Sequence, residues 1–225
     1  MSTVKFRLAL KQINKTFIQK MSTVSKENPV NLNNYHMNKK PFYIFPIPKD
    51  ITPSFELVRT LSNALNKMTY YYYEKEYSDK NFISGANLAI TQMAKAIREH
   101  DIEAINELTV KQFATEIREK MAIIPQDVLK ERLSFTKDNI VHAFIHALFT
   151  APQKPFNLDP EALCFYGKVV AIIDPNSTQQ VSLNKALKNA NDDTLFCNVT
   201  VCRHLNPLDI WKISHINFFD KRFVY

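Results

Sequence analysis

The chain has 225 residues, of which 45% are hydrophobic and 12% aromatic, and it carries a formal net charge of +7. This length accommodates one domain of moderate size and an extension, and the composition excludes a disordered or fibrous protein. No run approaches the roughly 18 to 20 apolar residues that a membrane-spanning helix requires, so we expect a soluble or peripheral protein.

The positive charge is concentrated near the N-terminus. Residues 1–50 contain nine of the 29 basic residues and two of the 22 acidic residues, so residues 51–225 contain 20 of each. Nucleic-acid binding depends on Lys and Arg that neutralise phosphates. The electrical balance of the remaining chain therefore weakens a nucleic-acid-binding interpretation.

The first 20 residues have the pattern of a basic amphipathic helix. Residues 2–20 contain no acidic residue, and much of the apolar set faces away from the basic set if the segment is helical. The apolar residues are Val4, Phe6, Leu8, Leu10, Ile13, Phe17 and Ile18, and the basic residues are Lys5, Arg7, Lys11, Lys15 and Lys20. With its Ser and Thr residues this segment is typical of a mitochondrial transit peptide, so we predict a presequence and linker over 1–40. An ordinary basic tail and a permanent membrane-surface helix are the alternatives, and a second start at Met21 would delete the helix.

The next segment is expected to lead into the domain in an extended conformation. Residues 41–53 include four prolines, and each removes a backbone donor and disfavours helical dihedrals in the residue before it. From Ser54 to about Tyr77 the residues suit a helix, although the aromatic run 70–73 locally favours a strand.

A clearer helix is predicted after Ser78 or Asp79, either of which is a suitable N-cap. Its apolar residues recur at spacings of three and four and predict one buried stripe, formed by Phe82, Ala86, Ala89, Ile90, Met93 and Ile97. Asp101 is expected to cap a short helix and Thr109 another, and Pro125 marks a break before one or two turns at 126–133.

Beyond Leu133 the apolar pattern becomes strand-like. Residues 140–149 are compatible with a strand or a buried helix, whereas 163–173 and 194–203 predict strands. The last strand, 210–219, is expected to place on one face Trp211, Ile213, His215, Asn217 and Phe219. Helices followed by strands predict an α+β fold, with N-terminal helices packed on one face of an antiparallel sheet.

The common catalytic and cofactor motifs are missing from the sequence. The two glycines, Gly85 and Gly167, belong to no phosphate-binding loop, and there is no nucleophile elbow or catalytic cysteine signature. The three cysteines lack CxxC spacing and are expected to be reduced, buried thiols. We therefore predict no catalytic residue and no cofactor.

Two histidine pairs are the remaining candidates for chemistry. His142 and His146 have the i, i+4 spacing of zinc ligands on a helix, yet on a strand they stand about 13 Å apart. His215 and Asp220 would serve as a base and its orienting acid, but a core-edge histidine and a solvated aspartate are the simpler interpretation. We predict no metal site.

Aromatic side chains provide the candidate binding residues. Tyr71, Tyr72 and Tyr73 are potential anchors for a partner protein, because aromatic residues dominate interface hot spots. Trp211 is a further candidate, since it would line a groove that holds a partner or a lipid. Packing of these aromatic rings in the core is the alternative for all four residues.

Three stretches together resemble a known family. The segment FISGANLAITQMAKAIREHDIEAINELTVKQFATEIREKM (82–121) resembles the opening of the Tim-forty-four-like domain, and DIWKISHINFF (209–219) resembles its closing strand. Within that superfamily, YYYEKEYSDKNFISGANLAITQMAKAI (71–97) is most similar to the m-AAA protease-interacting protein branch. The resemblance covers roughly residues 70–220.

This resemblance implies a fold, a location and a function. The fold would be a curved antiparallel sheet in a cystatin or NTF-two-like cone, with a lead-in segment and helix at 41–69 and the Tim-forty-four-like domain at 70–225. The location would be the mitochondrial matrix, peripheral to the inner membrane. The function would be that of a non-enzymatic adaptor or chaperone, which binds the m-AAA protease and newly imported membrane-protein subunits, such as the calcium uniporter regulator, and assists their sorting or assembly.

Two other functions stay open at this point. One is that of the related protein of the mitochondrial large ribosomal subunit, which helps hold the ribosome at the membrane. The balanced charge of residues 51–225 argues against the phosphate contacts that this function needs. The other is a small-molecule isomerase or hydratase that uses the pocket of the cone, for which a deep pocket with converging polar groups would be required.

Overall fold

The computed structural model describes residues 41–46, 57–152 and 163–223. Residues 41–225 form one compact unit. The predicted presequence and linker, and the later part of the proline-rich lead-in, lie outside the described residues. In chain order the elements are α2 (Leu57–Tyr73), α3 (Asp79–Glu99), α4 (Ile102–Leu108), α5 (Lys111–Ile123), α6 (Gln126–Arg132), a 3₁₀ turn (Lys137–Asn139), β1 (Ile140–Pro152), β2 (Leu163–Ile173), α7 (Leu183–Asn189), β3 (Leu195–His204), β4 (Lys212–Asp220) and a last 3₁₀ turn (Lys221–Phe223).

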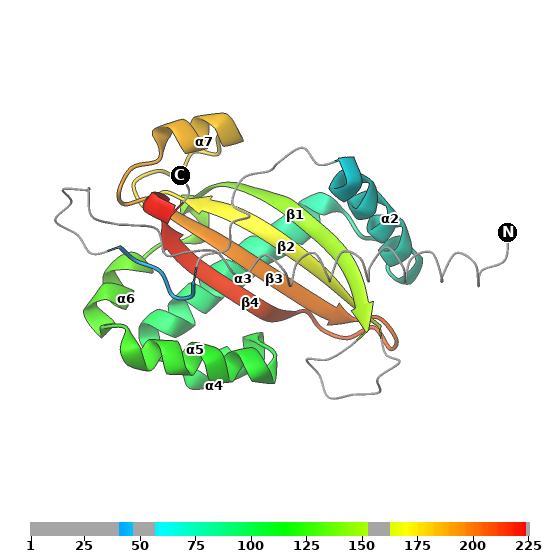
Figure 1. Ribbon diagram of the computed structural model, residues 1–225, viewed down its shortest axis with the longest axis horizontal. Helices are drawn as coiled ribbons and strands as arrows, with labels where there is room; N and C mark the ends of the chain where they lie inside the picture. The colour runs from blue at the N-terminus through cyan, green and yellow to red at the C-terminus, as the bar shows by residue number, and fades with distance from the viewer. Residues whose placement is uncertain (1–40, 47–56, 153–162, 224–225) are drawn as a thin grey trace, which may run out of the picture. The chain divides into compact units, whose positions relative to one another are not determined.

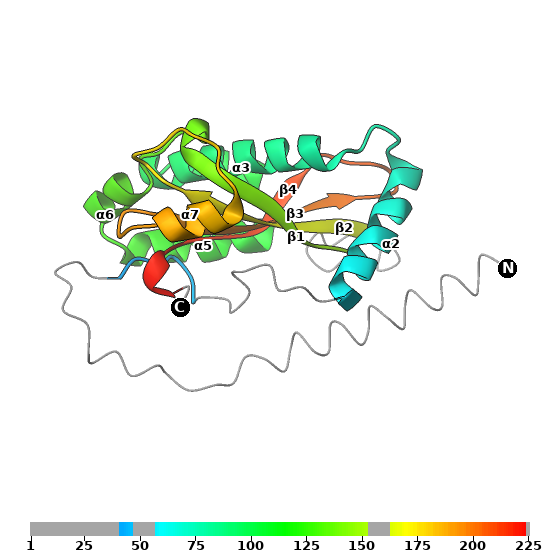
Figure 2. The ribbon, with the colours of Figure 1, turned by 90° about the horizontal axis from the view of Figure 1, so that it is seen from above.

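The four strands form one open antiparallel sheet in the order β1-β2-β3-β4. Helix α3 lies across one face of this sheet and α5 lies beside the edge strand β4, while α2 and α7 lie near opposite ends of the strands (Figures 1 and 2). The predicted α+β fold, with N-terminal helices on an antiparallel sheet, is confirmed.

Helix α3 is the central element of the helical layer. It begins where predicted, because the side-chain oxygen of Ser78 accepts a hydrogen bond from the Asn81 amide at 3.2 Å. It ends at His100, which takes a left-handed conformation with φ 55°. The predicted stripe faces the sheet, and its buried members are Phe82, Ala86, Ile90, Met93 and Ile97.

One predicted helix cap is wrong. Asp101 caps α4 as expected, but α5 begins after Val110 and not after Thr109. The Thr109 hydroxyl donates to the Ile105 carbonyl at 2.7 Å, so it closes α4 and does not open α5. The Val110 amide donates to the Ile213 carbonyl at 3.0 Å, which ties the junction of the two helices to β4.

The strands resolve one ambiguity and correct one prediction. Residues 140–149 belong to β1 and are not helical. The single face predicted for the last strand is wrong, because Thr200 pairs with His215 while the next residue, Val201, pairs with Ile213. The bulge skips one residue of β4 and reverses the alternation of its side chains. Ile213 therefore packs in the main core, whereas Phe219 lies in a smaller core on the other face.

Gly167 allows the closest approach between α3 and the sheet. A Cβ atom at this position would lie 2.3 Å from the ring of Phe82 and 3.2 Å from Leu148. The missing side chain therefore lets Phe82 contact β2 directly. Gly85 on α3 has open space around the corresponding position.

Helix α7 was not predicted from the sequence. Its seven residues cover the start of β1 and the end of β2, where a second core forms from Val141, Ile172, Ala186, Ala190, Phe196 and Phe219. The spacing of Leu183, Ala186 and Leu187 after Ser182 is a helical signal, but the segment is too short for a firm prediction.

Residues 41–46 run along β4, at one edge of the sheet. Tyr43 forms an antiparallel bridge with Phe219, and the Ile44 amide donates to the Phe218 carbonyl at 3.2 Å. This segment covers backbone groups of an edge strand, which would otherwise be open to pairing with another chain.

Candidate protein-binding surface

Helix α2 lies along the other edge of the sheet and is held there by polar contacts. The Leu148 amide of β1 donates to the side-chain oxygen of Asn63 at 2.8 Å, and the Asn63 amide nitrogen donates to the His146 carbonyl at 3.4 Å. The Thr150 hydroxyl donates to the side-chain oxygen of Asn66 at 3.1 Å. The side chain of Asn63 thus takes the place of a strand backbone beside the bulge of β1 between residues 145 and 147.

Tyr70 anchors the C-terminal end of α2. Its ring is fully buried and stacks on Phe165 of β2, with the ring centroids 4.2 Å apart. Its hydroxyl is bound to the Glu74 carboxylate and accepts a hydrogen bond from Arg203 of β3 at 2.9 Å. Arg203 also donates to Glu74 at 2.8 Å, so these three side chains fasten α2 to the sheet. Burial and the bond to Glu74 raise the pKa of Tyr70 well above its usual range, so the phenol stays protonated.

The polar and apolar sides of α2 are inverted relative to an ordinary surface helix. The side that faces the sheet carries Asn63, Asn66 and Tyr70, while large apolar residues point away from it. Leu57 is 71% exposed, Met68 72% and Tyr72 76%. We call the exposed side of this helix the outer face of α2, and it consists of Leu57, Val58, Thr60, Leu61, Ala64, Met68, Tyr71 and Tyr72.

The structure separates the four predicted binding residues. Tyr71 and Tyr72 lie on the outer face of α2, whereas Tyr73 is half-buried and packs against the main core. Trp211 is also half-buried and contacts Phe82 at 5.3 Å between centroids, with Arg203 over its ring at 5.6 Å. Only Tyr71 and Tyr72 therefore share an exposed surface, and Trp211 packs into the aromatic cluster around Tyr70.

A lysine lies against the two exposed tyrosines. The Lys75 ammonium is 5.1 Å from the centroid of the Tyr71 ring and 5.6 Å from that of Tyr72. This cation–π geometry places a positive charge at the C-terminal end of the outer face. Helix α2 itself contains no acidic residue, and its basic residues are Arg59 and Lys67.

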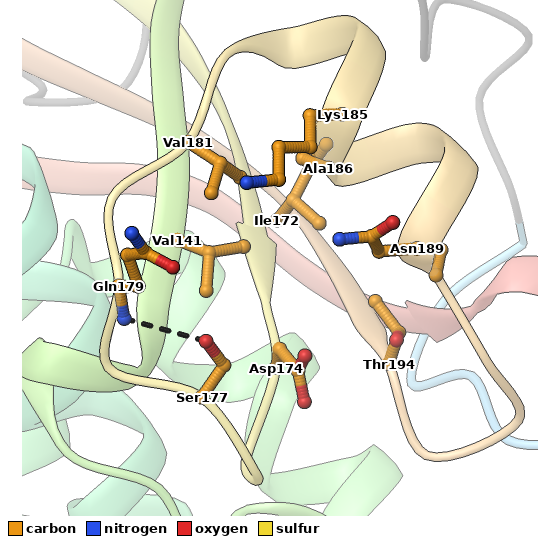
Figure 3. A pocket seen from close by; sticks show the side chains of 11 residues that line it. Val141, Ile172, Asp174, Ser177, Gln179, Val181, Lys185, Ala186, Asn189 and Thr194 are labelled. Carbon is orange, nitrogen blue, oxygen red and sulfur yellow. Dashed lines mark hydrogen bonds between the residues drawn. The ribbon is translucent and has the colours of Figure 1, made fainter.

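Two pockets lie outside the interface between α3 and the sheet. One, of about 150 Å³, is beneath α7 and is lined by the apolar Val141 and Ile172 and by the polar Asp174, Ser177 and Lys185 (Figure 3). Another, of about 100 Å³, lies beside α6 and the end of β2. The space between α3 and the sheet is filled by large buried side chains, among them Tyr70, Ile90, Met93, Ile97, Phe113, Phe165 and Phe218.

A polar row crosses the sheet on the side away from α3. Lys168 of β2 pairs in register with Thr200 of β3, which pairs with His215 of β4. The buried Asn198 lies two residues before Thr200 on β3. Burial and the neighbouring Lys168 lower the pKa of His215, while Glu116 opposes that shift. Neither of the two pockets includes these residues.

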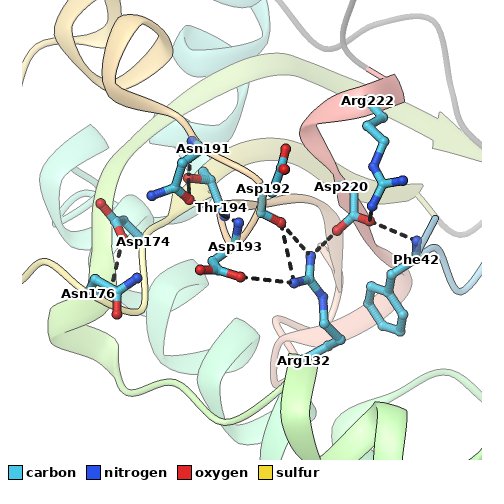
Figure 4. Close-up of polar contacts among 10 residues, drawn as sticks. All are labelled: Phe42, Arg132, Asp174, Asn176, Asn191, Asp192, Asp193, Thr194, Asp220 and Arg222. Atoms are coloured by element: carbon cyan, nitrogen blue, oxygen red, sulfur yellow. Dashed lines mark hydrogen bonds and ion pairs between the residues drawn. The ribbon is translucent and has the colours of Figure 1, made fainter. Parts of the chain in front are cut away.

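His215 and Asp220 are not brought together. They are five residues apart on β4, a distance of about 16 Å along a strand. The buried Asp220 is bound to Arg132 and accepts a hydrogen bond from the Phe42 amide at 2.8 Å (Figure 4). Asp220 thus joins α6, β4 and residues 41–46. The ring of His215 lies against those of Phe45 and Phe113, with ring centroids 5.2 Å apart in each pair.

The structure places the other candidates for chemistry as follows. His142 is half-buried on β1 and its ring contacts the Val181 carbonyl at 3.0 Å, while His146 is buried on the same strand. In the described ranges no three His, Cys, Asp or Glu side chains are grouped as metal ligands would be. The three cysteines are free and buried, and burial raises the pKa of Cys164 to about 11 and that of Cys202 to about 12.

None of the helices at 57–152 and 163–223 is long and apolar enough to cross a bilayer.

No protein-family model matches the chain, and no curated protein matches it. The similarity to the Tim-forty-four-like domain therefore stays a prediction from residues 71–121 and 209–219.

The outer face of α2, apart from its tyrosines, is a candidate surface that was not predicted from the sequence. A signal was present, because Leu57, Leu61, Ala64 and Met68 recur at spacings of four and three, and Asn63 and Asn66 lie on the other side. Periodicity alone predicts that such a stripe faces the core, and only the contacts of the asparagines with β1 show the opposite.

Proposed function

We propose that the protein is a non-enzymatic adaptor or chaperone of the mitochondrial matrix, peripheral to the inner membrane. It binds the m-AAA protease and newly imported membrane-protein subunits, such as the calcium uniporter regulator, and assists their sorting or assembly. The outer face of α2 is the observation that carries this proposal. Contiguous exposed apolar surface of this kind marks sites of interaction with proteins or membranes.

Two features of the sequence support the same proposal. The basic, acid-free segment 2–20 is typical of a matrix address, and residues 51–225 carry as many acidic as basic residues. A balanced charge suits contacts with polypeptides better than contacts with ribosomal RNA, which require many cations. The resemblance of residues 71–97 to the m-AAA protease-interacting branch supplies the identity of the partner.

Affinity purification from mitochondrial extract tests the proposed function. The full chain, tagged at its C-terminus, is expected to recover the m-AAA protease together with small inner-membrane subunits. A parallel purification of the Met68→Glu variant, altered on the outer face of α2, should recover less of these partners. Recovery of large ribosomal subunits in their place would support the ribosomal alternative and overturn the proposal.

A further inference from the structure

The outer face of α2 is broad and carries no charge. At 100° per residue its members span about 160° of the helix circumference. All of them are apolar or aromatic except Thr60. Of the two charged residues of α2, Arg59 lies on the side toward the sheet and Lys67 lies at the margin of the outer face. This surface extends over the whole length of α2, about 25 Å for 17 residues.

We infer that the outer face of α2 binds an apolar α-helix of another protein, with an acidic residue at the end that meets Lys75. This inference rests on the proposed function for the class of partner, and it specifies which surface binds and what chemistry the bound segment has.

An uncharged face selects an uncharged partner. Burial of a polar or charged surface against Leu61 and Met68 would remove its hydration and supply no hydrogen bond in return. The row Leu57, Leu61, Ala64 and Met68, with its alternating spacing, is the ridge-and-groove pattern that receives the side chains of a second helix. Small Ala64 lies in the middle of this row and allows close approach.

Charge disfavours a second copy of the chain as this partner. A parallel pair of α2 helices would bring Lys75 next to both its own counterpart and the exposed Glu76 of the other copy, so the charges give no net attraction. An antiparallel pair would place Lys75 near the N-terminal end of the other helix, where the helix dipole is positive and the first turn has no acidic residue. An acidic residue on a different helix removes this conflict.

The basic residues of α2 disfavour an anionic membrane as the main partner. Surface helices that bind anionic lipid carry Lys and Arg beside their apolar face. Lys67 is instead bound to Asp79 at 2.5 Å, and Arg59 is half-buried on the side away from the centre of the outer face. Lys75 lies at the C-terminal end of the outer face with its charge against the tyrosine rings.

Fluorescence anisotropy with a defined peptide tests this inference. The probe is a labelled 20-residue helix of leucine and alanine with two glutamates at one end and two lysines at the other. The full chain is expected to bind it saturably, and Leu61→Glu and Met68→Glu should each weaken binding at least tenfold. The matched control is Ile123→Glu on α5, because Ile123 is 74% exposed and lies outside the outer face, and it should bind as the unaltered chain does.

A second peptide isolates the role of Lys75. Lys75→Ala should weaken binding of the glutamate-ended peptide several-fold. The same substitution should leave unchanged the affinity for a peptide with lysines at both ends. Equal affinity of the Leu61→Glu variant and the unaltered chain would overturn the inference. So would a dimer in light scattering that Leu61→Glu dissociates, or flotation with cardiolipin-containing vesicles that the same variant abolishes, because these results assign the face to a second copy or to lipid.

The affinity purification and the peptide-binding assay distinguish failure of the proposed function from failure of the inferred surface. Peptide binding without recovery of the m-AAA protease would remove the proposed function and leave the helix-binding surface. Recovery of the protease equally by the unaltered chain and by Met68→Glu, with no peptide binding, would leave the function and remove this surface.

Discussion

Asn217 and Phe45 are joined by two hydrogen bonds that reproduce the pairing of two strands. The Phe45 amide donates to the side-chain oxygen of Asn217 at 2.9 Å, and the Asn217 amide nitrogen donates to the Phe45 carbonyl at 3.0 Å. Asn63 makes the corresponding contacts to β1 at the other edge of the sheet. Each edge strand is thus covered through an asparagine side chain, at positions where no neighbouring strand of the sheet continues the ladder.

Loss of the Asn217 amide should destabilise the fold. Asn217→Ala leaves the buried N–H and C=O of Phe45 without partners, which is expected to cost about 2 to 4 kcal/mol of unfolding free energy. Urea denaturation measures this loss. Asn189→Ala on the exposed surface of α7 is the control and should change stability by less than about 0.5 kcal/mol. Equal effects of the two substitutions would contradict the structural role of Asn217.

Removal of Asn63 should loosen α2 without unfolding the sheet. Asn63→Ala frees the Leu148 amide, so we expect hydrogen exchange at Leu148 and along α2 to accelerate by tenfold or more, which corresponds to about 1.4 kcal/mol. Exchange of β2 and β3 amides should stay within about twofold of the unaltered chain. A uniform acceleration over all strands would show that α2 and the sheet unfold as one unit.

The two glycines should respond to alanine with opposite signs. Gly167→Ala forces the Phe82 ring away from β2 and is expected to cost about 1 to 3 kcal/mol. Gly85→Ala, which meets open space inside α3, should stabilise by about 0.5 to 1 kcal/mol. Combining Gly167→Ala with Phe82→Leu should restore part of the loss, because the smaller side chain makes room for the new methyl group. A destabilising Gly85→Ala would contradict the exposed position of that residue.

His215 should make stability depend on pH in the acidic range. Burial lowers the pKa of His215 below its usual value near 6.5, so the unfolded chain binds a proton more readily than the folded one. The free energy of unfolding should therefore fall as pH decreases through the unfolded pKa toward the folded one. His215→Gln is expected to flatten this part of the pH profile in denaturation experiments between pH 7.5 and pH 5. An unchanged slope would show that other groups account for the acid sensitivity.

The helical layer and the order of strands followed from local patterns in the sequence. Ser78 and Asp101 are strong caps, and the stripe on α3 has regular spacing, so local chemistry and tertiary packing agree there. Thr109 fits the same capping rule, but a bond from Val110 to β4 moved the start of α5 by one residue. The pairing of residues 41–46 with β4 depends on contacts more than 150 residues apart, and local patterns contain no information on it. The bulge of β4 arises in its pairing with β3, and the alternation of side chains within β4 does not indicate it.

The candidate surface was predictable only in part. The tyrosine run 70–73 indicated binding residues, yet four consecutive residues of a helix point in four directions. Tyr70 became a buried anchor because Arg203 and Phe165 of the sheet receive it, and Tyr71 and Tyr72 were left exposed. Which tyrosine faces the sheet depends on the polar contacts of Asn66 and Asn63, which lie about one and two turns before Tyr70 in α2.

Site-specific photo-crosslinking in intact mitochondria tests the central claim most directly. A benzophenone side chain placed at Tyr72, on the outer face of α2, is expected to crosslink the m-AAA protease or newly imported inner-membrane subunits. The same group placed at the equally exposed Ile123 should give none of these products. Crosslinks from Tyr72 to ribosomal RNA or ribosomal proteins, or products no more abundant than those from Ile123, would contradict the account.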